Sequence, residues 1–310
     1  MESVRRAVID VGTNSAKLLV ADVRGLDIQP VLEESRQTRL GRGFYETHRL
    51  QPEPIARTVE AVWEFAQIAR EKSASSIRII ATSAARDAVN ADELTTAITR
   101  ASGLNTEIIS GEREAEWAYQ GVATDPELAK TRLLLLDVGG GSTEFILGRG
   151  GQKQFACSFP FGTVRLLEKF PHGDPPTREE FNRCRDWLAT FLRQEVRPAL
   201  TPALKSEADE IRLVGTGGTA SILARVEKKL DRFDRDKIEH AVLSLKQVTA
   251  HRKRLWGMSL EERKDVPGLP RQRADVILTG VLIYESLMTE FGLDTLLVST
   301  RGLRFAAVMD

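Results

Sequence analysis

The chain has 310 residues, 42% of them hydrophobic and 28% charged, which is the composition of a soluble globular protein with room for two domains. Its 44 basic and 44 acidic residues cancel. A protein that binds nucleic acid through its overall field is basic, so we expect no nucleic-acid partner, and any polyanion must be bound by local loops. The N-terminus enters a strand pattern without a signal-peptide core, and no apolar run reaches membrane length, so we expect no membrane association and a cytoplasmic location.

Strand and helix patterns alternate along the chain, which predicts α/β structure. In the first part we expect a hairpin over Ala7–Val23, a loop over Leu40–Pro54, a helix over Ile55–Lys72, a strand over Ile77–Ala81 with a helix from Ala84, and a strand over Thr106–Ile109 with a helix from Glu112. A polar turn at Thr124–Lys130 marks a domain boundary. In the second part we expect a strand–turn–strand over Arg132–Leu147, a strand over Gln152–Phe161, helices over Thr163–Phe170 and Glu179–Val196, a strand over Ile211–Gly215 that enters a helix, a helix over Arg273–Phe291, a strand over Leu296–Ser299 and a helix over Arg301–Met309.

The most informative stretch is Arg132–Leu147, RLLLLDVGGGSTEFIL. Three successive glycines lack a Cβ, so the backbone N–H groups of such a turn can close on an anion. Asp137 and Glu144 flank this turn and would by themselves repel a phosphate, which suggests that a divalent cation lies between acids and anion. The alternative from the residues alone is a glycine-rich hairpin without a ligand.

The chain carries this pattern twice. DVGTNS begins at Asp10 and DVGGGS begins at Asp137, each after an apolar strand. Asp, Val, Gly and Ser match in register, which predicts a structural duplication rather than two unrelated hairpins. Two such loops that face each other across a cleft would bind a phosphoanhydride from both sides.

Three strand-to-helix junctions add candidate residues. Arg86 falls in the first turns of a predicted helix, where a guanidinium could hold a phosphate, or it could form a surface ion pair with Asp87. Glu114 opens the next helix, where a carboxylate is also common because it favours the helix dipole. Ile211–Gly215 delivers Thr216, Gly217 and Gly218 to a helix start, which is either a further anion site or a plain turn.

Seven motifs in order carry a resemblance to a known family. They are AVIDVGTNS from Ala7, TSAARDAVN from Thr82, IISGEREA from Ile108, LLDVGGGSTEF from Leu135, FPFGTVRL from Phe159, LVGTGGTAS from Leu213 and RADVILTGVLI from Arg273. The chain resembles the exopolyphosphatase/guanosine pentaphosphate phosphohydrolase (Ppx/GppA) family, within the actin, Hsp70 and sugar-kinase superfamily. The resemblance spans nearly the whole chain.

The resemblance implies two actin-like (ribonuclease H-like) α/β domains with an interdomain cleft. We expect domain I over residues 1–126 and domain II over residues 127–310, with the last helix, about 301–310, able to pack back on domain I. Longer relatives continue into C-terminal helical domains, whereas the form implied here is a short one without such an extension. The family resemblance also suggests a homodimer.

The resemblance also assigns roles. Glu114 matches the family's catalytic glutamate, which acts as general base on water, with Glu112 as the competing assignment. Arg86 would stabilise the transferring group, and Lys17 is a candidate second cation with a surface role equally open. The expected Mg²⁺ ligands are Asp10, Asp137 and Glu144. The expected phosphate-binding residues are Gly12, Thr13, Asn14, Ser15, Gly139, Gly140, Gly141, Ser142, Thr143, Gly215, Thr216, Gly217 and Gly218.

The predicted reaction is hydrolysis of the terminal phosphoanhydride of inorganic polyphosphate, with release of orthophosphate. The close alternative is removal of the 5′-terminal phosphate of guanosine pentaphosphate, and nucleoside di- or triphosphates are a third substrate class. A sugar or acetate kinase shares the loops but has no match to IISGEREA. A non-hydrolytic module that binds ATP or guanosine tetraphosphate is the non-enzymatic alternative.

Overall fold

The computed structural model describes residues 2–205 and 210–310. The chain divides into two compact units. Unit 1 runs to Pro126 and includes the C-terminal segment Arg301–Asp310, whereas unit 2 comprises Glu127–Thr300. The last residues therefore belong to the unit that begins the chain.

Unit 1 is built on a five-stranded sheet with the order β3-β2-β1-β4-β5. Its strands are β1 (Val4–Val11), β2 (Ala16–Arg24), β3 (Asp27–Arg36), β4 (Ser76–Ala81) and β5 (Thr106–Ile108). The first three form antiparallel pairs, and β4 and β5 then run parallel to β1. This arrangement brings the end of β1, with Asp10, beside the end of β4, which leads to Arg86.

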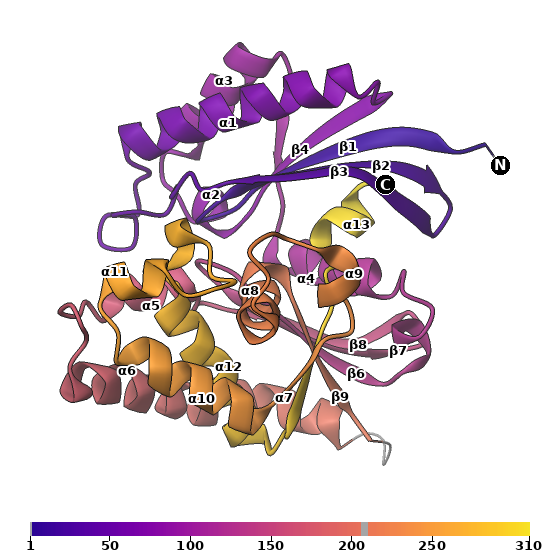
Figure 1. The fold of residues 1–310 in the computed structure, drawn as a ribbon. Coiled ribbons are helices and arrows are strands. Elements are labelled where there is room, and N and C mark those ends of the chain that lie inside the picture. Colours follow the sequence, from indigo (N-terminus) through magenta and orange to yellow (C-terminus); the bar gives the residue numbers. More distant parts are fainter. Residues whose placement is uncertain (1, 206–209) are drawn as a thin grey trace. The chain divides into compact units, whose positions relative to one another are not determined.

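Side chains alternate between the two faces of the unit 1 sheet, and apolar side chains are buried on both. Helices therefore cover both faces. Two longer helices, α1 (Pro52–Glu71) and α3 (Ala91–Ser102), pack on the face that includes Ile9 and Leu18 (Figure 1). The helices α4 (Gly111–Val122) and α13 (Leu303–Ala307) pack on the opposite face. A four-residue helix, α2 (Ser83–Arg86), follows β4 directly.

Unit 2 is built on a six-stranded sheet with the order β10-β11-β9-β6-β7-β8. Its strands are β6 (Leu133–Val138), β7 (Thr143–Arg149), β8 (Gln152–Phe159), β9 (Arg212–Thr216), β10 (Val242–Ser244) and β11 (Thr295–Val298). Antiparallel β6, β7 and β8 are followed in the sheet by β9 and β11, which run parallel to β6. The carboxyl ends of β6 and β9 therefore meet at one edge.

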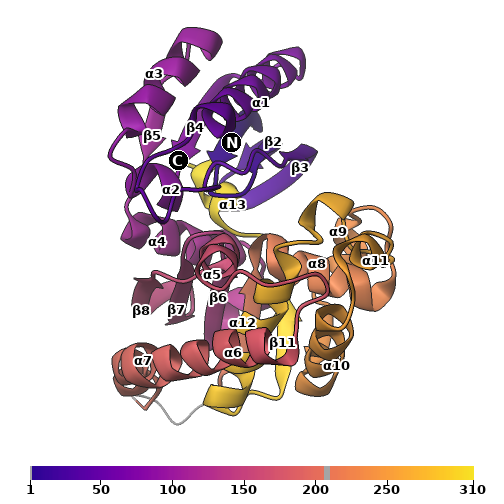
Figure 2. The ribbon, with the colours of Figure 1, turned by 90° about the vertical axis from the view of Figure 1, so that its left-hand side faces the viewer.

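The helices of unit 2 surround one large apolar core. They are η1 (Leu128–Lys130), α5 (Thr163–Lys169), α6 (Arg178–Phe191), η2 (Leu192–Val196), α7 (Arg197–Leu204), α8 (Gly217–Lys228), α9 (Arg235–Ile238), α10 (Leu245–Trp256), α11 (Leu260–Lys264), η3 (Arg271–Arg273) and α12 (Ile277–Phe291). The apolar helix α12 contacts α5, α6, α8 and α10 (Figure 2). It is the central helix of this core.

The two sheets repeat the same plan. In each unit an antiparallel three-stranded meander is followed by parallel strands added beside its first strand, so that β1, β2, β3 and β4 correspond to β6, β7, β8 and β9. The first hairpin of each meander is closed by a four-residue turn, between Val11 and Ala16 in unit 1 and between Val138 and Thr143 in unit 2. The predicted duplication and the α/β class are confirmed.

Several elements differ from the sequence predictions. The strand β3 and the helix α3 were not predicted, and the helix expected from Ala84 is only the short α2. The helix expected over Arg273–Phe291 begins at Ile277, after a short 3₁₀ turn. The helix expected over Glu179–Val196 contains a π-helical turn at its end and continues into α7 through Pro198. Proline is tolerated there because it lies in the first turn of α7.

Candidate active site

The two hairpin turns have the same internal hydrogen bond. In unit 1 the backbone N–H of Gly12 donates to the carbonyl of Ser15 at 3.1 Å, and in unit 2 Gly139 donates to Ser142 at 3.0 Å. A Cβ on either glycine would lie only 3.2 Å and 3.1 Å from that carbonyl oxygen. The shared DVG–S spacing therefore encodes one turn geometry twice.

Neighbouring segments bind the carbonyl groups of both turns. In unit 2 the carbonyls of residues 139 and 140 accept from backbone N–H groups of residues 163–165 at 2.8–3.0 Å, and Arg165 Nε donates to the carbonyl of Gly141 at 2.8 Å. In unit 1 the carbonyl of Thr13 accepts from Gly41 at 2.7 Å, and that of Asn14 accepts from Arg39 at 3.0 Å. The start of α5 and the loop after β3 thus hold the two turns in the same way.

This anchoring leaves the N–H groups of the turns for a ligand. Among the turn and loop hydrogen bonds of the described residues, none uses the backbone N–H of residues 13–15 or 140–142. Close packing keeps the turns in place, since a Cβ on Gly41 would meet Thr13, and one on Gly162 would meet Gly140, closer than 3.0 Å. Successive N–H groups in such a turn form a concave site for an anion.

Several buried polar atoms of unit 1 have no hydrogen-bond partner within the described part of the chain, and two of them belong to segments near the first turn. These two are Nδ2 of Asn14, in the turn itself, and Oγ of Ser83, at the start of α2. The Oδ1 atom of the same asparagine accepts from Gln37 at 3.2 Å. Buried polar groups are nearly always paired, so these two donors are consistent with a bound oxyanion.

Arg86 and Glu114 lie together in unit 1. The guanidinium Nη1 of Arg86 is 2.9 Å from Oε2 of Glu114 and also donates to the carbonyl of Ile109 at 3.1 Å. Their side chains are 22% and 12% exposed, whereas Glu112, two residues earlier in the same helix, is exposed to solvent. The contact with Asp87 that the sequence suggested is longer, at 3.8 Å. The structure thus favours Glu114 over Glu112 as the carboxylate beside the arginine.

Asp10 is buried on the sheet face that carries α4 and α13. Its residue is 8% exposed, and burial raises its pKa, with the nearby charges of Lys17 and Arg304 acting in the opposite direction. Lys17 is its direct cross-strand neighbour and is half-buried, rather than a fully exposed surface lysine. Arg304, from the C-terminal helix, donates to the carbonyl of Leu18 at 2.8 Å. Sequence reasoning missed Arg304 because no local pattern links residue 304 to residue 10.

The acids of unit 2 form a cross-strand pair. Asp137 and Glu144 are opposite each other on β6 and β7, so their carboxylates lie on the same sheet face. Glu144 is only 1% exposed and accepts from Ser158 Oγ at 2.8 Å. A Cβ on Gly217, which has a φ of +80°, would lie closer than 3.0 Å to Asp137 Oδ1. The carboxylate of Asp137 therefore touches the first residue of α8.

The start of α8, which is one of the predicted phosphate-binding segments, lies beside Asp137 in unit 2. Thr216 pairs with Asp137 across parallel strands, and Gly217 and Gly218 begin the helix. Arg273 Nη2 lies 3.1 Å from the position that a Cβ on Gly218 would take. The helix start therefore lies between an acid and a guanidinium. The sequence offered Arg273 only as part of a motif, without a role.

The acidic residues fit a hard cation. Carboxylate oxygens are the ligands that Mg²⁺ prefers. Two carboxylates directly opposite each other on a sheet repel each other, and a buried carboxylate whose pKa is raised is costly to keep ionised. A bound divalent ion offsets both costs, so Asp10 in unit 1 and the pair Asp137 and Glu144 in unit 2 are suitable ligands.

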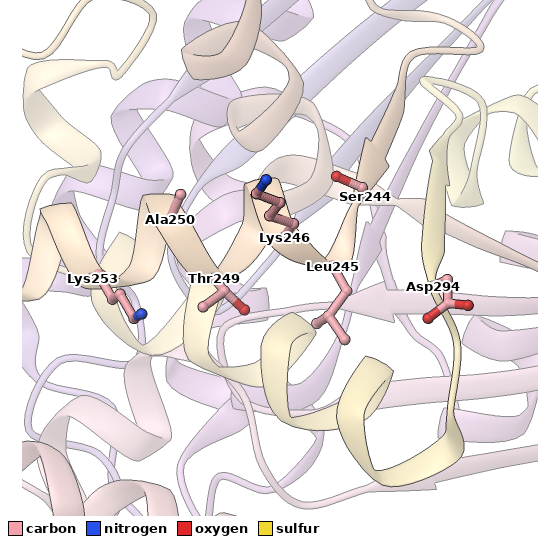
Figure 3. A pocket seen from close by; sticks show the side chains of 7 residues that line it. All are labelled: Ser244, Leu245, Lys246, Thr249, Ala250, Lys253 and Asp294. Atoms are coloured by element: carbon pink, nitrogen blue, oxygen red, sulfur yellow. The ribbon is translucent and has the colours of Figure 1, made fainter.

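A separate hollow of about 620 Å³ lies in unit 2, at the start of α10 (Figure 3). Lys246, Thr249 and Lys253 line one side along the helix, and Asp294 lies across from them. Asp294 directly precedes β11, which runs parallel to β9 and β6. The hollow is therefore at the opposite end of the sheet from Asp137 and contains none of the predicted site residues.

Comparison with known proteins identifies the family. The model of the Ppx/GppA phosphatase family matches residues 19–309. This chain belongs to the Ppx/GppA phosphatase family. Exopolyphosphatase 2 of Mycobacterium tuberculosis is 35% identical to it, and the match covers 96% of both chains. The crystal structure of the Aquifex aeolicus family member matches with a TM-score of 0.79 and 32% identity, over 99% of this chain and 97% of that one.

A second solved structure, that of an exopolyphosphatase from Cytophaga hutchinsonii, has a TM-score of 0.86 and 27% identity and covers 97% of this chain and 96% of that one. Membership of the Ppx/GppA family confirms the predicted fold of two actin-like units and the predicted enzyme class, a phosphoanhydride hydrolase. Among the described residues, no helix has both the length and the apolar character needed to span a membrane.

Proposed function

We propose that this Ppx/GppA protein is an exopolyphosphatase, which removes orthophosphate from the end of inorganic polyphosphate. The observation that carries the proposal is the pair of matched turns, each anchored through its carbonyls and each with N–H groups left for an anion. A polyphosphate end presents several anionic oxygens in a row, which suits two such turns better than one. The name of the M. tuberculosis relative supports the same substrate.

The phosphate-binding groups are the turns at residues 12–15 and 139–143 and the helix start at Gly215–Gly218. Their backbone N–H groups and hydroxyls bind the phosphate oxygens of one chain end. Asn14 Nδ2 adds a side-chain donor in the first turn. Because the net charge of the protein is zero, binding depends on these local donors and on a few placed cations such as Lys17.

Glu114 is the general base and Arg86 stabilises the transferring phosphoryl group. The guanidinium of Arg86 donates a hydrogen bond to the carboxylate of Glu114. A terminal phosphate competes for the guanidinium, which releases Glu114 to accept a proton from an attacking water. The water oxygen forms the new P–O bond, and the shortened chain leaves with the electrons of the broken anhydride bond.

Asp10, Asp137 and Glu144 would hold Mg²⁺. When bound, the ion supplies positive charge that neutralises the phosphate oxygens and the charge that develops on the leaving oxygen. The task of the protein is to keep the three carboxylates fixed, which it does through burial of Asp10 and through the hydrogen bond from Ser158 to Glu144. The proposal includes a cytoplasmic location, since both free cysteines suit a reducing compartment. It also includes a homodimer, which rests on the family resemblance.

The test is phosphate release from a panel of tripolyphosphate, long polyphosphate, guanosine pentaphosphate and ATP, each with Mg²⁺ and with EDTA. The proposal expects Mg²⁺-dependent release that is fastest with polyphosphate. Faster release from guanosine pentaphosphate would instead favour the guanosine pentaphosphate phosphohydrolase. Tight nucleotide binding without any phosphate release would favour a non-hydrolytic module, and release only when a sugar or acetate acceptor is present would indicate a kinase.

A further inference from the structure

The side chain of Gln37 contacts the first phosphate-binding turn and has no part in the mechanism described so far. Gln37 directly follows β3 and is half-buried. Its amide Nε2 donates to Oδ1 of Asn14 at 3.2 Å. Asn14 is only 5% exposed, so this hydrogen bond is largely shielded from solvent.

Backbone contacts hold Gln37 beside the turn. At the turn, the ladder between β2 and β3 ends with the pair of Ala16 and Arg36, and Gln37 is the next residue. Two residues later, the N–H of Arg39 donates to the carbonyl of Asn14 at 3.0 Å. One segment thus binds Asn14 through its backbone carbonyl and through its side-chain oxygen, and neither contact uses the side-chain nitrogen.

An asparagine amide can face a ligand in two orientations. It presents either its NH₂ group, which donates hydrogen bonds, or its oxygen, which only accepts them. The bond from Gln37 takes up Oδ1 of Asn14, whereas Nδ2 is buried and has no hydrogen-bond partner among the described residues. Phosphate oxygens are acceptors, so the orientation that leaves Nδ2 for a ligand is the one that suits an anion.

We infer that Gln37 is a positioning residue, which orients the amide of Asn14 so that Nδ2 donates to the bound phosphate. The inference rests on the proposed function, because it requires that the turn at residues 12–15 binds phosphate. Oε1 of Gln37 is also buried and has no hydrogen-bond partner in the described part of the chain. In the alternative pairing of the two amides, Nδ2 of Asn14 would donate to this oxygen, and Oδ1 would be turned towards the phosphate.

Glutamate in place of Gln37 would enforce that alternative pairing. A carboxylate has nearly the same shape as the amide but only accepts hydrogen bonds. It would therefore take Nδ2 of Asn14 as its donor and leave Oδ1 for the ligand. The substitution also adds a negative charge, which repels an anion whatever the orientation of Asn14, so the experiment must separate orientation from charge.

The test is a double-mutant cycle of Gln37→Glu and Asn14→Ala, with the dissociation constant for inorganic phosphate measured by calorimetric titration. Asn14→Ala removes the donor, and we expect the constant to rise roughly 10-fold, as for loss of a hydrogen bond to a charged group. Gln37→Glu alone should have an effect of similar size. In the Asn14→Ala background, Gln37→Glu should weaken binding far less, because no amide is left to turn.

Two further variants serve as controls for charge and packing. Gln37→Met removes the hydrogen bond without adding a charge, and it should raise the constant less than Gln37→Glu does, since nothing then enforces the wrong orientation. Gln29→Glu adds the same charge on β3, where the exposed amide of Gln29 donates to Asp27 at 2.7 Å. This variant should leave phosphate binding unchanged.

For Gln37→Glu we also expect KM for tripolyphosphate to rise with little change in kcat, because the phosphate is bound in the ground state and in the transition state alike. An equal effect of Gln37→Glu in both backgrounds would overturn the inference, since charge alone would then explain it. A lower urea midpoint with an unchanged phosphate constant would also overturn it, because Gln37 would then only pack against the turn. Failure of the wild type to bind phosphate would overturn the proposed function as well, so the two failures are distinguishable.

Discussion

The guanidinium of Arg86 and the carboxylate of Glu114 form an ion pair, with Nη1 and Oε2 2.9 Å apart, although the residues are separated by 28 positions in the chain. Each comes from the segment that follows a parallel strand of the same sheet, Arg86 after β4 and Glu114 after β5. Because the carboxyl ends of parallel strands meet at one edge, the fold itself brings together Glu114, the proposed general base, and Arg86, the proposed phosphate-binding residue.

Replacement of Glu114 by glutamine should abolish most of the activity. Glutamine keeps the shape and a hydrogen-bond acceptor but cannot take a proton, so we expect turnover to fall about 10²- to 10⁴-fold with little change in KM. The measurement is steady-state phosphate release. Glu112→Gln is the matched control, because Glu112 lies on the same helix and is exposed to solvent. Near wild-type turnover of Glu114→Gln, or loss only in Glu112→Gln, would refute the assignment of the base.

Replacement of Arg86 by methionine should slow the chemical step more than it weakens binding. The guanidinium is proposed to bind the group in transfer, and arginines in comparable sites contribute roughly 10³-fold or more to turnover. We therefore expect a large fall in kcat and a smaller rise in KM. Arg49→Met removes an arginine from an exposed ion pair with Glu93 and should leave both constants unchanged. A change in KM alone for Arg86→Met would limit Arg86 to substrate binding.

Replacement of Gly217 by alanine should damage the unit 2 site specifically. The new Cβ would collide with Asp137 Oδ1, and the φ of +80° is unfavourable for alanine by about 1 kcal/mol. Gly103→Ala is the control, since it has a φ of +74° and open space around its Cβ position. Both variants should lose similar stability in urea unfolding, but only Gly217→Ala should lose activity. Equal activity of the two variants would exclude a role for Asp137.

The difference in unfolding free energy between an Asp10→Asn variant and the wild type should depend on pH. Burial raises the pKa of Asp10 above the ordinary value of 3.8, so the folded chain binds the proton more tightly than the unfolded chain. Ionised Asp10 therefore destabilises the fold increasingly as pH rises through its folded pKa. In urea unfolding with EDTA, Asp10→Asn should be more stable than the wild type at pH 7, and the difference should shrink towards pH 3.

The control for this pH series is Asp22→Asn, for which the sign is opposite. The hydrogen bond from Arg5 lowers the pKa of Asp22, so its stabilising effect is present above the unfolded pKa and is lost as pH falls through the folded pKa. Asp22→Asn should thus be slightly less stable than the wild type at pH 7, with no difference in strong acid. The same sign for both variants would mean that Asp10 is not held in an unfavourable buried state.

The parts of the fold and site that could be predicted from sequence are those encoded locally. The turns follow from glycine spacing after an apolar strand, and the duplication follows from DVG–S at Asp10 and Asp137. The pairing of Asp137 with Glu144 also follows, because a four-residue turn fixes the register of the hairpin. In such cases a few neighbouring residues decide the geometry.

Contacts between distant segments could not be predicted. Arg304 contacts the hairpin of Asp10 from the other end of the chain, and no sequence pattern near residue 304 predicts this contact. The strand β3 was missed because it is an edge strand with mostly exposed side chains, which gives weak alternation. The boundary of α12 was misplaced because the polar residues before Ile277 form a 3₁₀ turn that continues the helical pattern. Tertiary packing decides these features.

The central claim is that water attacks the terminal phosphorus of a polyphosphate held at the Ppx/GppA site. The most direct measurement is hydrolysis of tripolyphosphate in H₂¹⁸O with Mg²⁺, followed by mass analysis of orthophosphate and pyrophosphate. The account predicts one ¹⁸O atom in each orthophosphate, none in pyrophosphate, and loss of the reaction in Glu114→Gln. Label in the pyrophosphate, or no hydrolysis by the wild-type protein, would contradict it.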